Sequence, residues 1–355
     1  MPLLARMVNS PLAIDVRRGA IASLGSLLAD RRIANEGRIA VAVGPGQGPQ
    51  IAADLDLPNC EVFQVDGGSV DVATELGKKL RSGAYEAVAG IGGGKTIDVT
   101  KFAASMAGIP MVAVATNLSH DGIASPVSSL EHESGKGSYG VTMPTAVVVD
   151  VDYVRAAPQR LVRSGIGDAV SNLSAIADWE LAGREQGEPV DGMAVTFARV
   201  AAEAIVHRQD SVDSQTFLTA LAEALVLSGM AMSVAGSSRP ASGACHEILH
   251  AIDQLYPGTS NHGELAGVGA LFAYFLRTRY QGADDDRIRD IRACLLRNEL
   301  PIVPTDIGLD EDQFARAVSH APATRPGRYT VLEHLNLTDD EIRRSVREYV
   351  QTVGH

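Results

Sequence analysis

Three histidines lie within a short segment, SGACHEILHAIDQLYPGTSNHGE, which covers Ser242–Glu264. His246 and His250 are four residues apart, so on a helix both side chains project from one face. Tyr256-Pro257-Gly258 should end that helix, and His262 is then expected in a glycine-bounded loop that folds back toward it. Such histidines suit zinc or another first-row metal. Three unrelated histidines remain the alternative, and a carboxylate ligand from elsewhere would decide between the two interpretations.

One candidate carboxylate is Asp168, in the stretch GIGDAVSN at positions 165–172. Ile166, Val170 and Leu173 flank it at helical spacing, which predicts that its side chain faces the interior. Buried carboxylates are seldom left unpaired. Asp168 is therefore expected either in an ion pair or at a metal.

A glycine-rich turn, GIGGGKTID, joins a predicted strand to a predicted helix at positions 90–98. Glycine lets the backbone approach a phosphate, and the free N–H groups of the first helical turn attract the anion. Lys95-Thr96 resembles part of a P-loop, but Ala89 stands where that motif needs glycine, so Walker-type hydrolysis is not expected. The loop at positions 44–49 also misses the dinucleotide fingerprint, because it ends in Pro49. A simple chain reversal remains the alternative.

A second polar loop, ATNLSHDGIASP, follows a predicted strand at positions 115–126. Ligands of open α/β sheets bind at the carboxyl ends of the strands. The alternative is a solvated connection. The polar side chains of this loop are Thr116, Asn117, Ser119, His120, Asp121 and Ser125.

The pattern of apolar and polar residues changes after about residue 155. Apolar runs separated by helix-length segments come first, and they predict a parallel sheet covered on both faces. Long amphipathic stretches follow, and they predict an all-helical region. We therefore expect an α/β dinucleotide-binding domain over residues 1–154 and an all-helical metal- and substrate-binding domain over residues 155–355. The predicted strands are Arg38–Val43, Cys60–Val65, Glu86–Ile91, Met111–Thr116 and Ala146–Val151.

Composition limits the classes of function. The 355-residue chain has a net charge of −12, whereas a nucleic-acid-binding protein would normally be basic, so no nucleic-acid partner is expected. Its three cysteines are widely separated, which favours a reducing compartment over a disulfide framework. No long apolar run follows a basic N-terminus, so neither a signal peptide nor a membrane span is expected. These features together predict a cytoplasmic protein.

The motifs, taken together and in order, resemble those of the sn-glycerol-1-phosphate dehydrogenase family. That family belongs with glycerol dehydrogenase, iron-containing alcohol dehydrogenases and dehydroquinate synthase. The resemblance implies a dehydroquinate synthase-like fold, in which a Rossmann-like parallel sheet precedes an all-α domain. The matching stretches are GIGGGKTIDVTK, TNLSHDGIASP, GIGDAVSN, SSRPASGACHEILHA, NHGE and RPGRYTVLEHL, which span about residues 40 to 335.

The resemblance also implies roles for individual residues. The pyrophosphate of NAD or NADP would be held by Gly92, Gly93, Gly94, Lys95 and Thr96. The nicotinamide-ribose side would be lined by Thr116, Ser119 and Ser125. The metal ligands would be Asp168, His246 and His262, for zinc or another divalent ion such as iron or nickel. Asp121 and His250 would contact the substrate and serve catalysis.

The implied reaction is the metal-dependent reduction of dihydroxyacetone phosphate to sn-glycerol 1-phosphate by NADH or NADPH. Arg239 and Lys136 are candidates for binding the phosphate of this small substrate, with an ordinary surface charge as the alternative for each. Asp66 follows the second predicted strand and is a candidate for favouring NADH, and the alternative is that it only begins the turn Asp66-Gly67-Gly68. The family usually has small residues where this chain has Asn117 and Leu118, which is compatible with a shifted substrate.

Three alternatives remain open: reduction of another phosphorylated or phosphonate carbonyl compound, a lyase or cyclase reaction like that of dehydroquinate synthase, and a non-catalytic binding role. A homo-oligomer is compatible with the sequence.

Overall fold

The computed structural model describes residues 8–35, 37–55, 59–133, 135–284 and 286–354. The chain divides into two compact units, residues 1–159 and 160–355. This boundary lies five residues beyond the predicted one, after the short helix α5 (Val151–Ala156). Each unit is described by itself.

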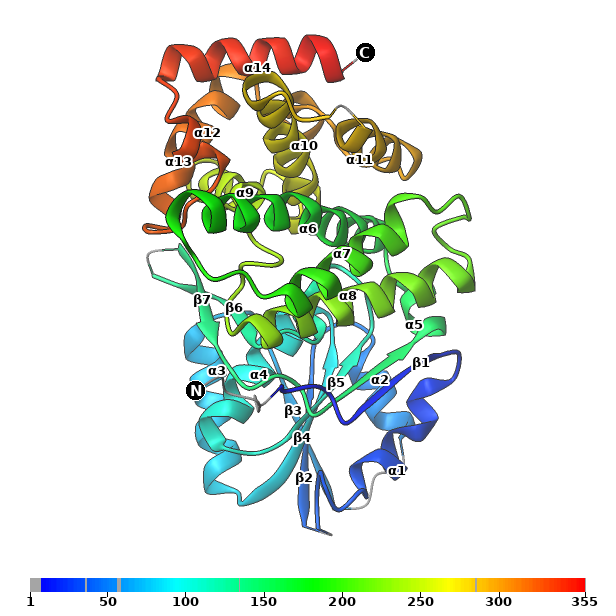
Figure 1. Ribbon diagram of the computed structural model, residues 1–355. Helices are drawn as coiled ribbons and strands as arrows, with labels where there is room; N and C mark the ends of the chain where they lie inside the picture. Colours follow the sequence, from blue (N-terminus) through cyan, green and yellow to red (C-terminus); the bar gives the residue numbers. More distant parts are fainter. Residues whose placement is uncertain (1–7, 36, 56–58, 134, 285, 355) are drawn as a thin grey trace. The chain divides into compact units, whose positions relative to one another are not determined.

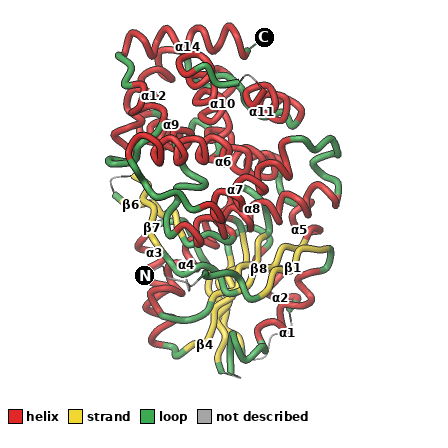
Figure 2. The backbone as a smooth tube through the Cα atoms, viewed as in Figure 1, coloured by secondary structure: helices red, strands yellow, loops and turns green. Residues whose placement is uncertain are grey.

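The first unit is built on a six-stranded sheet in the order β1-β8-β5-β4-β2-β3, and every neighbouring pair is parallel (Figures 1 and 2). The predicted parallel α/β sheet is confirmed. β1 was not predicted, because it is an edge strand of alternating apolar and charged residues rather than an apolar run. The strands are β1 (Ala13–Arg17), β2 (Arg38–Val43), β3 (Cys60–Gln64), β4 (Tyr85–Gly92), β5 (Met111–Ala115) and β8 (Ala146–Asp150).

Helices cover both faces of this sheet. One face packs its alternate residues, such as Val41, Ala89 and Val114, against the short segments η1 (Ala20–Ser23), α1 (Leu24–Leu28) and α2 (Gly48–Asp54). The other face packs closely against α4 (Gly94–Ala107). A Cβ on Gly90 of β4 would lie 2.9 Å from the Thr100 side chain, so glycine permits this close approach. α3 (Val70–Ser82) packs beside α4. A two-stranded antiparallel hairpin, β6 (Val127–His132) and β7 (Gly135–Gly140), completes the unit with η2 (Asp121–Ile123).

The order of the strands reverses between β2 and β4. From β2 the chain runs outward to β3, whereas from β4 it runs the opposite way to β5 and β8. Ligands of doubly wound sheets bind at the carboxyl ends of the two strands that flank such a reversal. Here those ends lead into the loop at Gly44 and into the glycine turn Gly92–Gly94.

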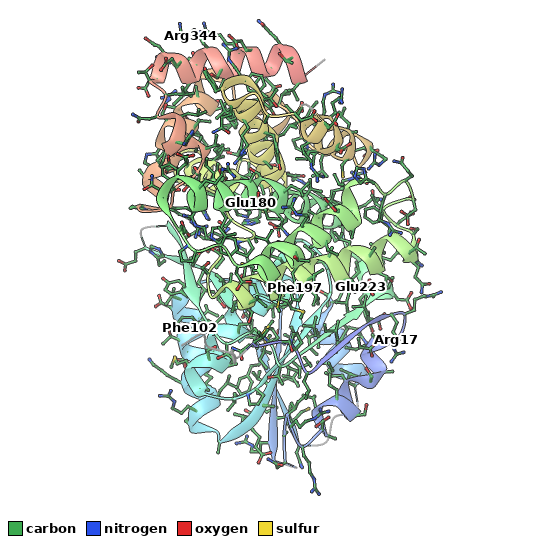
Figure 3. The ribbon with its side chains drawn as sticks, in the orientation of Figure 1. Arg17, Phe102, Glu180, Phe197, Glu223 and Arg344 are labelled. Atoms are coloured by element: carbon green, nitrogen blue, oxygen red, sulfur yellow. The ribbon has the colours of Figure 1, made fainter. Side chains whose placement is uncertain are left out.

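Within the described residues of the second unit, every regular element is a helix, as predicted. His262 corrects one expectation: it is the first residue of α10 and does not lie in the preceding loop. Side chains such as Arg344 of α14 extend outward from the helices (Figure 3). The helices are α6 (Gln159–Gln186), α7 (Gly192–Val206), α8 (Gln215–Ala235), α9 (Ala244–Leu255), α10 (His262–Gln281), α11 (Asp286–Arg297), η3 (Pro304–Ile307), α12 (Glu311–Thr324), α13 (Val331–Leu335) and α14 (Asp339–Val353).

α8 is long and apolar enough, by length and composition alone, to cross a membrane. In the folded unit it packs along α7, and 61% of its most apolar window is buried. Its hydrophobicity is that of a helix in the core of unit 2.

Candidate metal centre and cofactor loop

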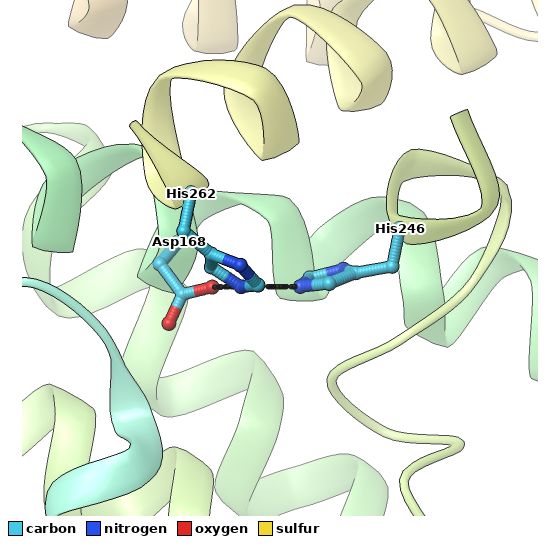
Figure 4. Close-up of side chains that lie close together, drawn as sticks. All are labelled: Asp168, His246 and His262. Atoms are coloured by element: carbon cyan, nitrogen blue, oxygen red, sulfur yellow. Dashed lines mark hydrogen bonds and ion pairs between the residues drawn. The ribbon is translucent and has the colours of Figure 1, made fainter. Parts of the chain in front are cut away.

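Three side chains from three helices of unit 2 converge at one point (Figure 4). Asp168 comes from α6, His246 from α9 and His262 from the start of α10. Asp168 Oδ1 lies 3.5 Å from His246 Nε2 and 3.4 Å from His262 Nε2. The two Nε2 atoms are 3.3 Å apart. The structure thus brings together the aspartate and two histidines that the family resemblance implied as ligands.

The size of this triangle fits a metal ion. Ligand atoms placed about 2.0–2.1 Å from a tetrahedral zinc lie about 3.3–3.4 Å from one another. The three observed separations, 3.3, 3.4 and 3.5 Å, match that spacing. Three protein ligands also leave a coordination position for a substrate atom, as catalytic metal sites require.

The protonation states suit metal binding. Burial opposes ionisation of Asp168, but the hydrogen bonds and charges of His246 and His262 hold the pKa of its carboxyl well below its usual value. Burial lowers the pKa of His246 to about 4, so its ring is neutral at neutral pH. A carboxylate and a neutral imidazole are the forms that bind metals.

A close approach of two helix backbones places Asp168 beside His262. A Cβ on Gly263 would lie 1.6 Å from the carbonyl oxygen of Ser164, and one on Gly167 would lie 2.1 Å from that of Gly263. The Gly263 N–H also donates to Ser164 Oγ at 3.1 Å. Only glycine at positions 167 and 263 permits this crossing, and each glycine is next in sequence to a ligand.

An ion pair at the start of α10 fixes the direction of His262. Glu264 forms a capping box with Asn261, which precedes the helix. Arg160, at the start of α6, holds both carboxylate oxygens of Glu264 at 2.9 and 2.7 Å. Arg160 therefore ties the helix that carries Asp168 to the helix that carries His262.

A second carboxylate on α6 positions α9. Gly243 precedes α9 and has no side chain that could cap the helix. Asp178 takes this role, because its Oδ2 accepts a hydrogen bond from the Ala244 N–H at 2.7 Å. Asp178 is fully buried and forms an ion pair with Arg277 at 2.5 Å. One helix thus provides a ligand and anchors the two helices that provide the others.

Cys245 orients the ring of His246. Its Sγ lies 3.3 Å from His246 Nδ1 and 3.8 Å from the carbonyl oxygen of Ser171. If the thiol donates to Ser171, its sulfur accepts from Nδ1–H, and Nε2 is left unprotonated toward the metal position. Burial raises the pKa of this thiol to about 12, so it stays neutral. Cys245 contacts the ring of His246 and is outside the Asp168/His246/His262 cluster.

His250 lies one helical turn beyond His246, with ring centroids 6.4 Å apart, and is not part of the ligand cluster. Arg325 Nη2 is 2.9 Å from its Nε2. The contacts of the two residues nominated for phosphate binding are as follows. Arg239 forms an ion pair with both oxygens of Glu188 and donates to Tyr329 O. Lys136 is an exposed residue of β7 in the first unit.

The predicted pyrophosphate turn joins β4 to α4. Gly92 ends the strand, Gly93 precedes the helix without a side-chain cap, and Gly94, Lys95 and Thr96 form its first turn. A Cβ on Gly44 would lie 2.2 Å from Thr96 Oγ1, so the two glycine loops at the strand reversal meet at this threonine. An uncapped helix start at this reversal fits a pyrophosphate. Lys95 pairs with Glu131 at 3.1 Å on the surface.

The polar loop at positions 115–126 covers this turn. A Cβ on Gly93 would lie 2.4 Å from Asn117 Nδ2, and one on Gly94 would lie 2.1 Å from His120 Nε2. Asn117 Oδ1 is buried without a hydrogen-bond partner among the described residues. The sequence indicated Asn117 as one of the polar loop residues and as a departure from the family, but its place over Gly93 depends on the fold.

The other loop residues are placed as follows. Thr116 is buried, and its N–H donates to Gly92 O at 3.0 Å. Asp121 is half-buried at the start of η2, and Ser119 is also half-buried. Ser125 is buried, and its hydroxyl donates to Val127 O at 3.2 Å. The roles of Ser119, Asp121 and Ser125 toward cofactor or substrate remain predictions.

Similarity to known proteins identifies the family. A protein of Hyperthermus butylicus named glycerol-1-phosphate dehydrogenase (NAD(P)+) is 34% identical over 347 residues, 96% of this chain and 97% of that one. One of the same name from Methanothermobacter thermautotrophicus is 35% identical over 346 residues, with the same coverage. The chain belongs to the glycerol-1-phosphate dehydrogenase family. A family model described as iron-containing alcohol dehydrogenase matches residues 15–158.

Solved structures share the fold of this glycerol-1-phosphate dehydrogenase family member. A probable glycerol dehydrogenase from Sinorhizobium meliloti superposes with a TM-score of 0.77 at 22% identity, covering 98% of this chain and 99% of that one. A sulfoacetaldehyde reductase from Bifidobacterium kashiwanohense gives a TM-score of 0.73 at 16% identity, covering 98% and 100%. The expected fold is confirmed.

Proposed function

We propose that this protein reduces dihydroxyacetone phosphate to sn-glycerol 1-phosphate with NADH or NADPH and a bound divalent metal. The observation that carries the proposal is the Asp168, His246 and His262 triangle, whose 3.3–3.5 Å sides fit one metal ion, in a chain of this family. Zinc is the proposed ion, because one carboxylate and two imidazoles in tetrahedral spacing suit it.

Bound at this triangle, the metal would supply a Lewis acid that stabilises negative charge developing on the substrate oxygen. The protein residues supply the rest. Arg160, Asp178 and Cys245 hold the three ligands in place. His250, one turn from His246, faces the substrate in this proposal, and His250 or water returns the proton to the oxygen. Asp121 is proposed to contact the substrate.

The cofactor is proposed to bind at the turn Gly92–Thr96, where an uncapped helix start meets the strand reversal. Thr116, Ser119 and Ser125 are proposed to lie on the nicotinamide-ribose side. Asp66 is exposed just after β3, which is hydrogen-bonded to β2 beside the reversal. An acidic group there would accept from a ribose 2′-OH and repel a 2′-phosphate. A preference for NADH is therefore proposed.

The test is cofactor oxidation with dihydroxyacetone phosphate, measured for NADH and NADPH before and after chelation. We expect turnover that is lost on chelation and restored by Zn²⁺. No net oxidation with protein that holds both metal and cofactor would contradict the proposal and favour a reaction like that of dehydroquinate synthase, in which the cofactor is regenerated. Faster oxidation with another phosphorylated or phosphonate carbonyl compound would instead correct the substrate.

A further inference from the structure

Two arginines in the second unit lie together, and no carboxylate contacts either of them directly among the described residues. Arg325 directly follows α12, and Arg328 lies in the loop before α13; both are half-buried. Neither has a carboxylate oxygen within 4.0 Å among the described residues. Arg239 and Arg277, by contrast, pair with Glu188 and Asp178. Partly buried charge without a counter-charge is costly unless something else compensates it.

The hydrogen bonds of the two guanidinium groups hold them side by side. Arg325 Nη1 and Arg328 Nη2 both donate to Ser238 Oγ, at 3.1 and 3.0 Å. Arg328 Nη1 also donates to Ser242 O, and Arg325 Nη2 bonds His250 Nε2. Each guanidinium thus uses two of its five N–H groups on described residues, which leaves three on each. Ser238 accepts twice, so its O–H is left to donate.

Mutual repulsion makes this arrangement unfavourable in the protein alone. Burial lowers the pKa of both guanidinium groups, that of Arg328 to about 10. The charges of Arg325 and Arg239 lower the pKa of Arg328 further, whereas the charges of Glu247 and Glu188 partly oppose this shift. Both groups still carry their charge at neutral pH. An anion bound between them would relieve the repulsion and take up the remaining donors.

We propose that Arg325, Arg328 and Ser238 bind the phosphate group of the substrate. This inference rests on the proposed function and assigns its substrate specificity. Two planar guanidinium forks and a hydroxyl match the three terminal oxygens of a phosphate dianion. Of the two residues nominated from the sequence, Arg239 is already paired with Glu188, and the nomination of Lys136 stays a prediction.

The position of the pair fits a short ketone phosphate. Arg325 bonds His250, and the His250 ring lies 6.4 Å from that of the metal ligand His246. In dihydroxyacetone phosphate only three bonds separate the carbonyl carbon from phosphorus. A substrate whose carbonyl oxygen faces the metal triangle can place its phosphate at the neighbouring turn of α9, where Arg325 contacts His250.

The kinetic test compares dihydroxyacetone phosphate with uncharged dihydroxyacetone in Arg325→Met and Arg328→Met. Each variant should lose at least ~30-fold more kcat/KM on the phosphorylated ketone than on the free one, since it loses charge-assisted hydrogen bonds to the phosphate alone. Arg199→Met is the matched control, because Arg199 pairs with Glu180 on the surface of the same unit. It should leave both values unchanged. An unchanged preference in both test variants would overturn the proposal.

A binding test separates this proposal from the proposed function. Inorganic phosphate is titrated calorimetrically into the metal-loaded protein, and binding should be present in the wild type and in Arg199→Met, and lost in both test variants. Equal phosphate binding by all four proteins would overturn the arginine assignment even if the enzyme reduces dihydroxyacetone phosphate. If phosphate binding requires Arg325 and Arg328 but the protein reduces no ketone, the anion-binding site is supported and the proposed function is contradicted.

Milder substitutions keep the test open should an Arg→Met variant fail to fold. Ser238→Ala removes one hydroxyl, and Arg328→Lys keeps the charge but loses the planar fork. Both should weaken phosphate binding by a smaller factor than Arg328→Met. Wild-type phosphate affinity in both would count against the site.

Discussion

Gly263→Ala should damage the metal site without touching a ligand. The added Cβ would lie 1.6 Å from the carbonyl oxygen of Ser164, whereas real contacts of this kind stay above 3.0 Å. The backbones of α6 and α10 must then separate by about 1.4 Å at this point. Since Asp168 and His262 flank the crossing, the same movement separates two of the three ligands.

The size of the effect follows from that displacement. Metal–ligand distances tolerate about ±0.2 Å, so a shift of more than 1 Å should cost at least ~10²-fold in metal affinity. Overpacking should also lower the free energy of unfolding of the metal-free protein by about 1–3 kcal/mol. The better helix propensity of alanine should offset up to about 1 kcal/mol of this loss.

The assay is zinc competition against a chelating dye, together with urea unfolding of the metal-free protein. Gly192→Ala is the control, because Gly192 also lies in the first turn of a helix and a Cβ there meets nothing within 4 Å. It should keep wild-type zinc affinity and stability, or gain slightly in stability. Wild-type zinc affinity in Gly263→Ala would refute the argument that the glycine crossing sets the ligand geometry.

Three further predictions concern single side chains. His262→Ala should lose bound metal by elemental analysis, whereas His250→Ala should keep it and lose activity; the reverse pattern would overturn the ligand assignment. Burial, with the nearby carboxylates, raises the pKa of Glu247 to about 9, so the folded state keeps a proton that the unfolded state releases above about pH 4.5. The free energy of unfolding should therefore fall as pH rises, by up to about 2.7 kcal/mol between pH 6 and pH 8 at 1.36 kcal/mol per pH unit. In urea unfolding of the metal-free proteins, Glu247→Gln should show a weaker dependence of this free energy on pH than the wild type. Equal dependence on pH in both proteins would contradict this prediction. Asp66→Ser should relax the preference for NADH in kcat/KM, and equal use of NADH and NADPH by the wild type would remove the basis of that prediction.

The sequence predicted the elements that are buried on both faces. Runs such as Arg38–Val43 and Met111–Thr116 are apolar except for one end residue each, and the structure has them as β2 and β5 with nearly the same bounds. β1 was missed because it carries two charged residues, Asp15 and Arg17, which pair with each other at 2.9 Å. The local sequence pattern does not predict an edge strand of this kind, which is recognised only from its pairing with a neighbouring strand.

The prediction of the metal ligands came from the family resemblance. The spacing alone was also compatible with three unrelated histidines. The residues that position the ligands could not be inferred in this way. Gly263 and Asp178 act on segments about a hundred and about seventy residues away in sequence, through contacts that exist only after folding. Arg325 and Arg328 did lie within a recognised motif, but a charged residue in a sequence does not reveal whether it has an acidic partner.

The most direct test of the central claim is one experiment on metal-free and zinc-reconstituted protein. Oxidation of NADH by dihydroxyacetone phosphate is followed, and the product is then offered to an enantiomer-specific glycerol-3-phosphate dehydrogenase. We expect turnover only with zinc bound, and a product that this enzyme does not oxidise, which identifies sn-glycerol 1-phosphate. Equal turnover by protein verified to be metal-free, or a product that the enzyme consumes, would contradict it.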